Sequence, residues 1–212
     1  MNIHRVLEPL MRPFRLRRMR HFMALMQPAA GTRVLDVGGT PFNWRLIGYP
    51  HEVVLLNLEP GGLGALPPNF SSVVGDGTAL AYGDATFEIC FSNSVIEHVG
   101  SWEQQRRFAD ELRRVGRRLW VQTPARSFFF EPHLLTPFVH WLPVAWRKRL
   151  LRNFSIWGWI ARPSQAVVDR FVDQTRLLGY RELQDLFPDC RILRERFCGM
   201  TKAYLVVRGA HG

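Results

Sequence analysis

Residues 34–40, with the sequence VLDVGGT, constrain the fold of this chain more than any other segment. An apolar run that contains Asp36 is followed directly by Gly38, Gly39 and Thr40. Glycine lets bare backbone approach a ligand, and open α/β sheets bind ligands at the carboxyl ends of their strands. The segment therefore predicts the end of a first sheet strand and one wall of a ligand cleft.

Two later apolar runs end in the same way. Glu59 follows the run 53–58, and Gly75-Asp76-Gly77 follows the run 70–74. In a parallel sheet the carboxyl ends of successive strands lie along one edge. Three polar strand ends in succession therefore predict a single cleft along that edge.

Short apolar runs alternate with helical patterns through the chain, which predicts right-handed βαβ units and a mostly parallel sheet. The clearest helix is expected at 101–115, with Ser101 as its N-cap and Gly116 as its stop. Further helices are expected at 41–49, 165–178 and 180–187. The seven strands are expected at 33–37, 53–58, 70–74, 87–93, 118–122, 191–196 and 201–208.

The length of 212 residues suits one domain with a sizeable core. Pro9 and Pro13 interrupt the helical pattern of residues 2–27, so two short helices are predicted there rather than one. Along the chain we expect basic N-terminal helices, a ligand-binding core, an aromatic and basic insertion, and C-terminal helices with a strand pair. These regions are 1–29, 30–125, 126–165 and 166–212.

The order of VLDVGG, an acid after the second strand, GDG and FSNSVIEHV resembles the class I S-adenosylmethionine-dependent methyltransferases. Within that class it is most similar to the branch of small-molecule and quinone-type enzymes, chiefly over residues 30–125. The resemblance implies a single Rossmann-like, doubly wound α/β domain. Its seven-stranded sheet would be mostly parallel with the last strand antiparallel, and a helical lid insertion would be added to it.

The resemblance also assigns S-adenosylmethionine to the three strand ends. Asp36 and its glycine loop would hold the methionine part, Glu59 the ribose hydroxyls and Asp76 the adenine amine. The usual third glycine of the loop is absent, because residues 41–44 read PFNW. The candidate cofactor-binding residues are Asp36, Gly38, Gly39, Thr40, Glu59, Asp76, Gly77 and Asn93.

Each of these positions also has a structural interpretation. The glycines suit a tight turn without a ligand, and Asp76 before Gly77 suits an Asx turn. Glu59 could be a solvated loop acid, and Asn57 is then the alternative ribose ligand because strand ends are uncertain by a couple of residues. At Asp76 the turn and the ligand contact are compatible.

Catalytic candidates follow the fourth strand. Methyl transfer from a sulfonium requires positioning and desolvation, and an oxygen nucleophile must also lose a proton. His98 titrates in the range that suits a base, with Glu97 beside it and His133 as a second candidate. A structural role at a helix start is the alternative for His98. Some relatives bind a divalent ion through Glu-x-x-Glu-His, but Ser94 replaces the first acid, so no metal is expected.

The formal net charge of +10 includes basic clusters at 12–20 and 147–152, which suit nucleic acid or anionic lipid, or alternatively solvated helix faces. Residues 138–160 combine tryptophan with arginine as membrane-interface segments do. They are expected to pack on the sheet and roof the pocket, to contact an anionic membrane, or to form a lid that does both. Three cysteines without CxxC spacing favour a reducing cytoplasm. Neither a spanning segment nor a signal peptide is predicted, so the expected location is cytoplasmic, with peripheral contact at the inner membrane face left open.

The predicted function is methyl transfer from S-adenosylmethionine to a small-molecule, lipid-linked or glycan acceptor, at oxygen. An RNA or DNA methyltransferase is the first alternative, because of the charge. Against it, the fourth strand ends in Ser-Asn-Ser-Val, whereas relatives that methylate base amino groups carry an Asn-Pro-Pro-Tyr type of sequence. A non-catalytic relative that binds a partner or lipid through 128–162 is the second alternative.

Overall fold

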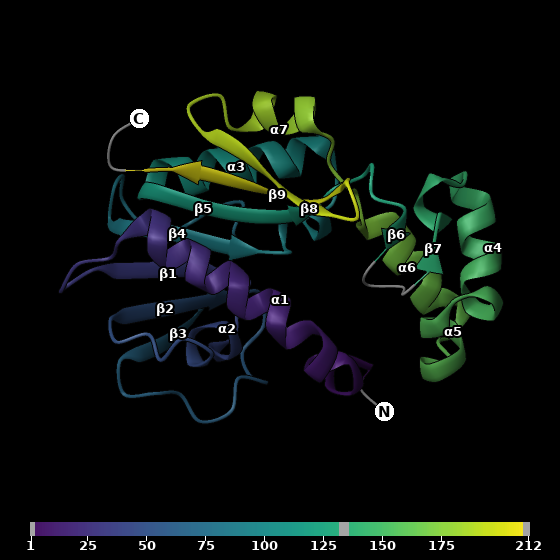
Figure 1. Cartoon of the computed structure of the whole chain (residues 1–212), viewed down its shortest axis with the longest axis horizontal. Coiled ribbons are helices and arrows are strands. Elements are labelled where there is room, and N and C mark those ends of the chain that lie inside the picture. The colour runs from purple at the N-terminus through teal and green to yellow at the C-terminus, as the bar shows by residue number, and fades with distance from the viewer. Residues whose placement is uncertain (1–2, 132–135, 210–212) are drawn as a thin grey trace.

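The computed structural model describes the backbone of residues 3–131 and 136–209, and the side chains of residues 12–129 and 136–209. Its main feature is a seven-stranded sheet in the order β3-β2-β1-β4-β5-β9-β8 (Figure 1). Only β9 runs in the direction opposite to the other six strands, which confirms the predicted sheet. The strands are β1 (Arg33–Val37), β2 (Glu52–Asn57), β3 (Phe70–Val74), β4 (Phe87–Asn93), β5 (Gly116–Pro124), β8 (Arg191–Phe197) and β9 (Met200–Arg208).

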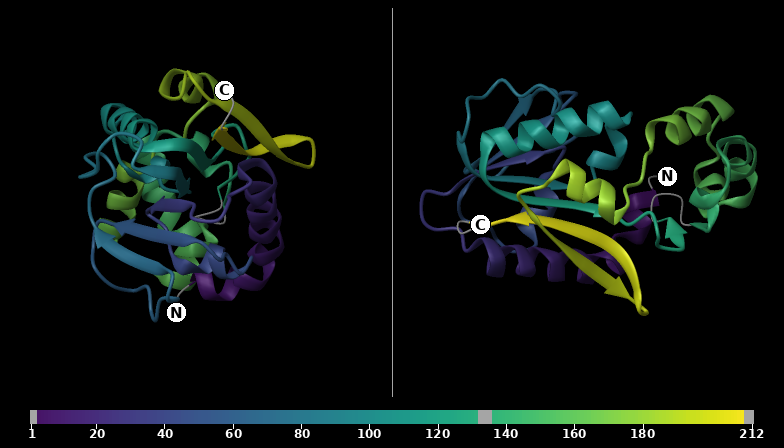
Figure 2. Two further views of the ribbon diagram at one scale, coloured as in Figure 1. Left: turned by 90° about the vertical axis from the view of Figure 1, so that its left-hand side faces the viewer. Right: turned by 90° about the horizontal axis from the view of Figure 1, so that it is seen from above.

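Helices cover both faces of this sheet, as a doubly wound fold requires (Figure 2). Phe108 and Leu183 belong to the core on the face that carries α3 and α7, and Phe22 and Trp44 to the core on the face that carries α1 and α2. The helices are α1 (Ile3–Met26), α2 (Pro41–Arg45), α3 (Trp102–Val115), α4 (Val144–Phe154), α5 (Ile156–Ala161), α6 (Gln165–Gln174) and α7 (Tyr180–Leu186).

The N-terminal helix α1 is one helix, so the prediction of two short helices was wrong. A proline removes one hydrogen bond to the carbonyl four residues earlier, but it does not have to end a helix that is held in place by packing. Met19, Phe22 and Met26 are fully buried against the sheet. Burial of each such side chain stabilises by about 1.5–3 kcal/mol, and this anchors the C-terminal part of the helix.

Helix α3 begins and ends as its sequence predicts. Ser101 and Gln104 form a reciprocal capping box at its start. At its end, Gly116 has extended backbone and is also the first residue of β5. A Cβ there would lie 2.8 Å from Sγ of Cys90, so glycine is required where α3 passes into the next strand.

The segment between β5 and α7 forms a separate helical lobe beside the carboxyl edge of the sheet (Figure 1). Short elements lead into it: β6 (Phe130–Glu131), β7 (Thr136–Pro137) and the 3₁₀ turn η2 (Val139–Trp141). Helices α4 and α6 enclose a small core of their own, made of Val139, Leu151, Val168 and Val172.

Phe128 is buried in the core of the sheet, but the tryptophans of this lobe do not pack on the sheet, so for them that expectation was wrong. Trp141, Trp146 and Trp159 are at least half exposed, and Trp157 packs on Phe171 of α6. The reason is that the lobe has its own small core and stands off the sheet. No helix in the described part of the chain is long and apolar enough to cross a membrane.

Helix α6 ends at Gln174, four residues before the predicted end. The chain then becomes extended and binds the main domain. Arg176 donates its backbone N–H to the carbonyl of Glu97, and Arg126 donates to the carbonyl of Leu178. These hydrogen bonds replace the last helical turn and tie the lobe to the ends of β4 and β5.

Candidate functional site

The three predicted strand ends lie together at one edge of the sheet. Strands β1, β2 and β3 are adjacent and parallel, with Val37 opposite Leu56 and Asn57 opposite Val74. Asp36 is the penultimate residue of β1, and Glu59 and Asp76 each follow their strand by two residues. The geometric premise of the sequence analysis is therefore confirmed.

Asp36 is fully buried beneath the loop that follows β1. Nε1 of Trp44 donates to its Oδ2 at 2.7 Å, while Oδ1 is buried without a hydrogen-bond partner among the described residues. Burial raises the pKa of this carboxyl to about 7, and the bond from Trp44 opposes the rise. The residues that replace the usual third glycine thus form α2 and supply a donor to Asp36. The sequence analysis missed this role of Trp44.

Gly38 and Gly39 close the loop over that carboxylate. Gly38 has φ +76° and donates its N–H to the carbonyl of Leu56 at 2.7 Å. A Cβ on Gly39 would lie 1.9 Å from Oδ2 of Asp36, so no larger residue fits there without displacing the acid. Nδ2 of Asn57 donates to the carbonyl of Gly39 at 3.1 Å. Asn57 therefore holds the loop in place.

Glu59 and Asp76 are both exposed at this edge. Oδ1 of Asp76 accepts from the backbone N–H and from the hydroxyl of Thr78, each at 2.8 Å. This is the Asx turn that Asp-Gly predicts, and it leaves Oδ2 of Asp76 available to a ligand. The next residue, Gly77, is buried, and a Cβ there would lie 2.6 Å from the ring of Phe108.

These residues suit S-adenosylmethionine. The orphaned Oδ1 of Asp36 is an acceptor directly under the glycine loop, where an ammonium or its bound water would be recognised. The glycine cradle admits a ligand against bare backbone, with the hydroxyl-bearing Thr40 exposed at its end. The exposed carboxylates of Glu59 and Asp76 offer acceptors to hydroxyl and amino groups.

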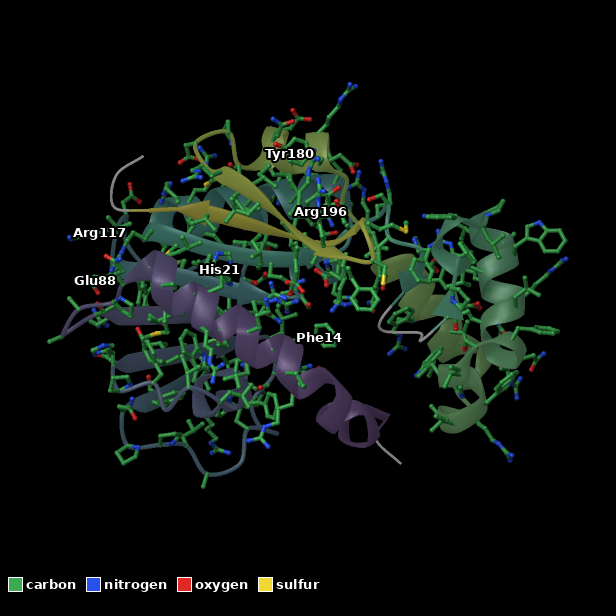
Figure 3. The ribbon with its side chains drawn as sticks, in the orientation of Figure 1. Phe14, His21, Glu88, Arg117, Tyr180 and Arg196 are labelled. Atoms are coloured by element: carbon green, nitrogen blue, oxygen red, sulfur yellow. The ribbon has the colours of Figure 1, made fainter. Side chains whose placement is uncertain are left out.

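Asn93 and its neighbours at the ends of β4 and β5 are held by an arginine from α1. Arg18 donates to Oδ1 of Asn93 and to Oε1 of Gln122, both at 3.1 Å, and pairs with Glu195 of β8 at 3.1 Å. Figure 3 shows the side chains of α1 crossing the sheet from His21 to Phe14.

The sequence analysis counted Arg18 only as part of a basic cluster. Its spacing of four residues from both Phe14 and Phe22 places all three on one face of α1. Phe22 is buried on the sheet, so this spacing is the signal that identifies Arg18 as an inward-facing residue.

The catalytic candidates occupy different environments. Glu97 is fully buried, and its Oε2 accepts from the hydroxyl of Thr123 at 3.0 Å. His98 ends the 3₁₀ turn η1 (Ile96–His98), and its Nδ1 lies 3.4 Å from the hydroxyl of Thr175. His133 lies outside the described residues.

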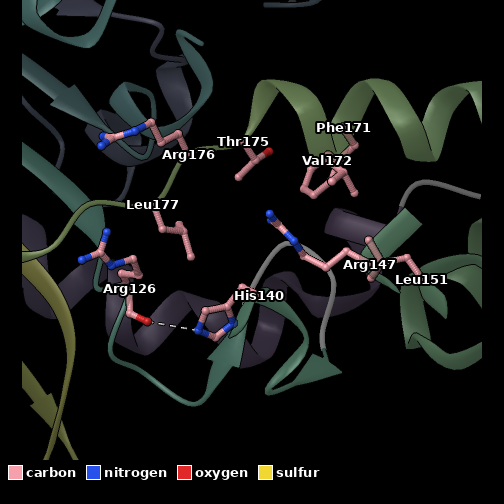
Figure 4. Close-up of a pocket in the computed structure, with 9 residues that line it drawn as sticks. All are labelled: Arg126, His140, Arg147, Leu151, Phe171, Val172, Thr175, Arg176 and Leu177. Carbon is pink, nitrogen blue, oxygen red and sulfur yellow. Dashed lines mark hydrogen bonds between the residues drawn. The ribbon is translucent and has the colours of Figure 1, made fainter. Parts of the chain in front are cut away.

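Thr175 also lines a pocket of about 200 Å³ between the helical lobe and the main domain (Figure 4). The imidazole of His140 and the guanidinium of Arg147 point toward its middle. The sequence offered no signal for this pocket, because its walls come from distant segments. Its lining residues are Arg126, His140, Arg147, Leu151, Phe171, Val172, Thr175, Arg176 and Leu177.

Comparisons with known proteins agree with this geometry. A family model described as a methyltransferase domain matches residues 35–118. No curated protein matches the chain at a significant level. Among solved structures, a SAM-dependent methyltransferase from Aquifex aeolicus is 14% identical with a TM-score of 0.52, over 91% of this chain and 87% of that one.

Two further structures show how widely this fold is used. The N-methyltransferase NodS from Bradyrhizobium japonicum is 12% identical with a TM-score of 0.54, over 92% of this chain and 95% of that one. The [4+2]-cyclase SpnF is 14% identical with a TM-score of 0.53, over 84% and 58%. At such identities the likeness concerns the fold alone, so the family model and the strand-end residues carry the assignment. Residues 35–118 match the model of a methyltransferase domain, and the chain as a whole has the fold of solved S-adenosylmethionine-dependent methyltransferases.

Proposed function

We propose that this protein transfers a methyl group from S-adenosylmethionine to an oxygen of an acceptor held between the sheet edge and the helical lobe. The observation that carries the proposal is the glycine cradle over Asp36, with Glu59 and Asp76 at the same edge. Bound S-adenosylmethionine supplies an activated methyl group. The protein has to bind it, orient the acceptor and remove a proton.

Each strand end has one task in this proposal. The loop after β1 and the buried Asp36 receive the methionine part, Glu59 accepts from the ribose hydroxyls, and Asp76 accepts from the adenine amine through Oδ2. Trp44 and Asn57 are positioning residues, since they hold Asp36 and Gly39 through the hydrogen bonds already described. Asn93 has its carboxamide oxygen bound to Arg18, so its amide N–H groups are what it offers the cofactor.

His98 is the proposed base. It follows β4, the neighbour of β1, and contacts Thr175 in the wall of the pocket. Glu97 helps to position His98. The backbone carbonyl of Glu97 accepts a hydrogen bond from the backbone N–H of Arg176, and this bond holds the pocket wall against the turn that carries His98.

The proposed acceptors are small molecules, lipid-linked molecules or glycans. The helical lobe supports an acceptor at a membrane surface. It contains ten of the sixteen exposed large hydrophobic residues of the described chain. Residues 138–162 include five arginines and lysines and no aspartate or glutamate. Exposed tryptophans beside arginines, without carboxylates, suit the headgroup region of an anionic bilayer.

Calorimetric titration with S-adenosylmethionine and with its demethylated product tests the cofactor proposal. A working enzyme is expected to bind either compound with a dissociation constant on the order of micromolar. Absence of binding to both would refute the function. Labelled cofactor incubated with cytosolic and lipid extracts then locates the acceptor. Label in RNA or DNA would favour the nucleic-acid alternative instead.

The base and the membrane surface need separate tests. We expect His98→Gln to lower kcat and flatten its pH profile while S-adenosylmethionine binding stays unchanged. Flotation with phosphatidylglycerol vesicles should be weakened by Trp146→Ser with Trp159→Ser. Leu58→Ser is the matched control, since Leu58 is equally exposed but lies at the cofactor edge. Equal effects of both changes would refute membrane contact through the lobe.

A further inference from the structure

The pocket between the lobe and the main domain adjoins an apolar groove. The groove has a volume of about 140 Å³ and is lined by Thr136, Pro137, Phe138, Val139, Leu142, Leu150, Leu151 and Phe154. Leu151 lines both cavities, and His140 of the pocket follows Val139 of the groove. A cationic cavity and an apolar cavity therefore meet along one wall of the lobe.

Arg147 is the cation that this pocket presents. Figure 4 shows its guanidinium between the hydroxyl of Thr175 and the ring of His140. Its Nε is buried, and no described residue accepts a hydrogen bond from it. The carboxylate that acts on it electrostatically is Asp173, which is already bound by Lys148 at 2.7 Å. Burial lowers the pKa of Arg147. A partly buried guanidinium with unused donors is costly unless an anion satisfies it.

The other cations of the pocket are arranged differently. The guanidinium groups of Arg126 and Arg176 turn away from its middle in Figure 4, and both pair with Glu182. One carboxylate is thus shared between two guanidinium groups, so the wall keeps a positive excess. His140 binds the carbonyl of Arg126, and burial together with nearby Arg147 lowers its pKa. Arg147 is therefore the main contact for an incoming anion.

We infer that the acceptor is an anionic amphiphile, whose phosphate or carboxylate binds Arg147 in the pocket and whose apolar chain lies in the groove toward Phe154. Identifying this ligand as the methyl acceptor rests on the proposed function, whereas the binding site itself does not depend on it. Arginine recognises both anions through paired N–H donors. An apolar chain in the groove would cover Leu142, Leu150 and Phe154, which line it.

Three probes separate the headgroup from the chain: octyl phosphate, inorganic phosphate and octyl glucoside, each titrated calorimetrically into the whole protein below micelle formation. Octyl phosphate should bind at least about tenfold more tightly than either other probe, because it alone supplies both contacts. Octyl glucoside binding as tightly as octyl phosphate would overturn the inference. Equal affinity for inorganic and octyl phosphate would also overturn it, in favour of a soluble anion.

Two pairs of variants locate the binding. Arg147→Gln should weaken octyl phosphate about tenfold, whereas Arg149→Gln should not, since Arg149 lies on the same helix but is exposed outside the pocket. Phe154→Ser should remove part of the contribution of the octyl chain to binding. Trp146→Ser should leave that contribution unchanged, because Trp146 is similarly exposed but lies outside the groove. Equal losses within either pair would show attraction to the surface only and refute the site.

Titrating the wild-type protein and the same variants with S-adenosylmethionine distinguishes the two proposals. If the wild-type protein does not bind S-adenosylmethionine but binds octyl phosphate through Arg147, the methyltransferase function fails and the amphiphile site stands. If S-adenosylmethionine binds and octyl phosphate does not, the amphiphile inference fails alone.

Discussion

The cofactor edge and the helical lobe are built on different principles. The cofactor edge is made of residues at the ends of adjacent strands, and the ladder fixes their register. The lobe has a small core of its own and exposes most of its large aromatic residues. The comparison indicates that the edge is positioned by the sheet as a whole, whereas the lobe can change without disturbing the edge.

The largest expected effect is at the glycine loop. Gly39→Val places a side chain where a Cβ would already lie 1.9 Å from the Asp36 carboxylate. Overpacking of this kind costs about 1–3 kcal/mol or more and displaces the loop, so S-adenosylmethionine binding should be lost. Calorimetry measures the binding, and circular dichroism confirms the fold. Gly83→Ala is the control, because its Cβ would have only an ordinary contact at 3.7 Å.

Stability should depend on pH through Asp36. Its pKa is about 7 in the folded protein, against an ordinary value of 3.8, so the folded state holds the proton more tightly. The stabilisation that protonated Asp36 contributes is fully present below pH 4. It is lost as the pH rises through 7, which lowers the free energy of unfolding by about 4 kcal/mol. Asp36→Asn lacks this dependence. Urea unfolding of both proteins between pH 4 and 8 should therefore diverge, and parallel curves would contradict the assignment.

A smaller effect is expected from the donor to Asp36. Trp44→Phe removes the bond to Oδ2 and leaves a buried carboxyl without its donor, which should lower the free energy of unfolding by about 1–3 kcal/mol beyond the lost packing. Trp120→Phe is a matched control, since Trp120 is equally buried and its Nε1 has no partner among described residues. Equal destabilisation in chemical denaturation would show that the hydrogen bond contributes nothing.

The smallest effect tests the independence of the lobe. Val168→Ala should destabilise the lobe by about 1–2 kcal/mol and speed amide exchange in α4 and α6, with S-adenosylmethionine affinity unchanged. Val34→Ala is its counterpart in β1, where both stability and affinity should fall. Loss of cofactor affinity in Val168→Ala would show that the two regions are coupled.

The same contrast explains what the sequence could predict. Strand ends such as Asp36 and Asp76 are set by local patterns of apolar runs and glycines, so their placement at one edge was predicted correctly. Contacts between distant segments have no local pattern. The bond from Trp44 to Asp36, the reach of Arg18 to Gln122 and the aim of Arg147 into its pocket all depend on tertiary packing. The unbroken α1 was missed because a proline removes one helical hydrogen bond without having to end the helix, which packs on the sheet beyond Pro13.

Arg18 has a consequence for the order in which this chain can mature. Its guanidinium joins an early helix to Glu195, which is synthesised 177 residues later. While the ribosome is still translating, Asn93 and Gln122 are already available to Arg18, but its counter-charge is missing. The end of the sheet that carries Asn93 and Gln122 thus gains its final electrostatic balance only when the β8–β9 hairpin has emerged, after β1, β2 and β3 are complete.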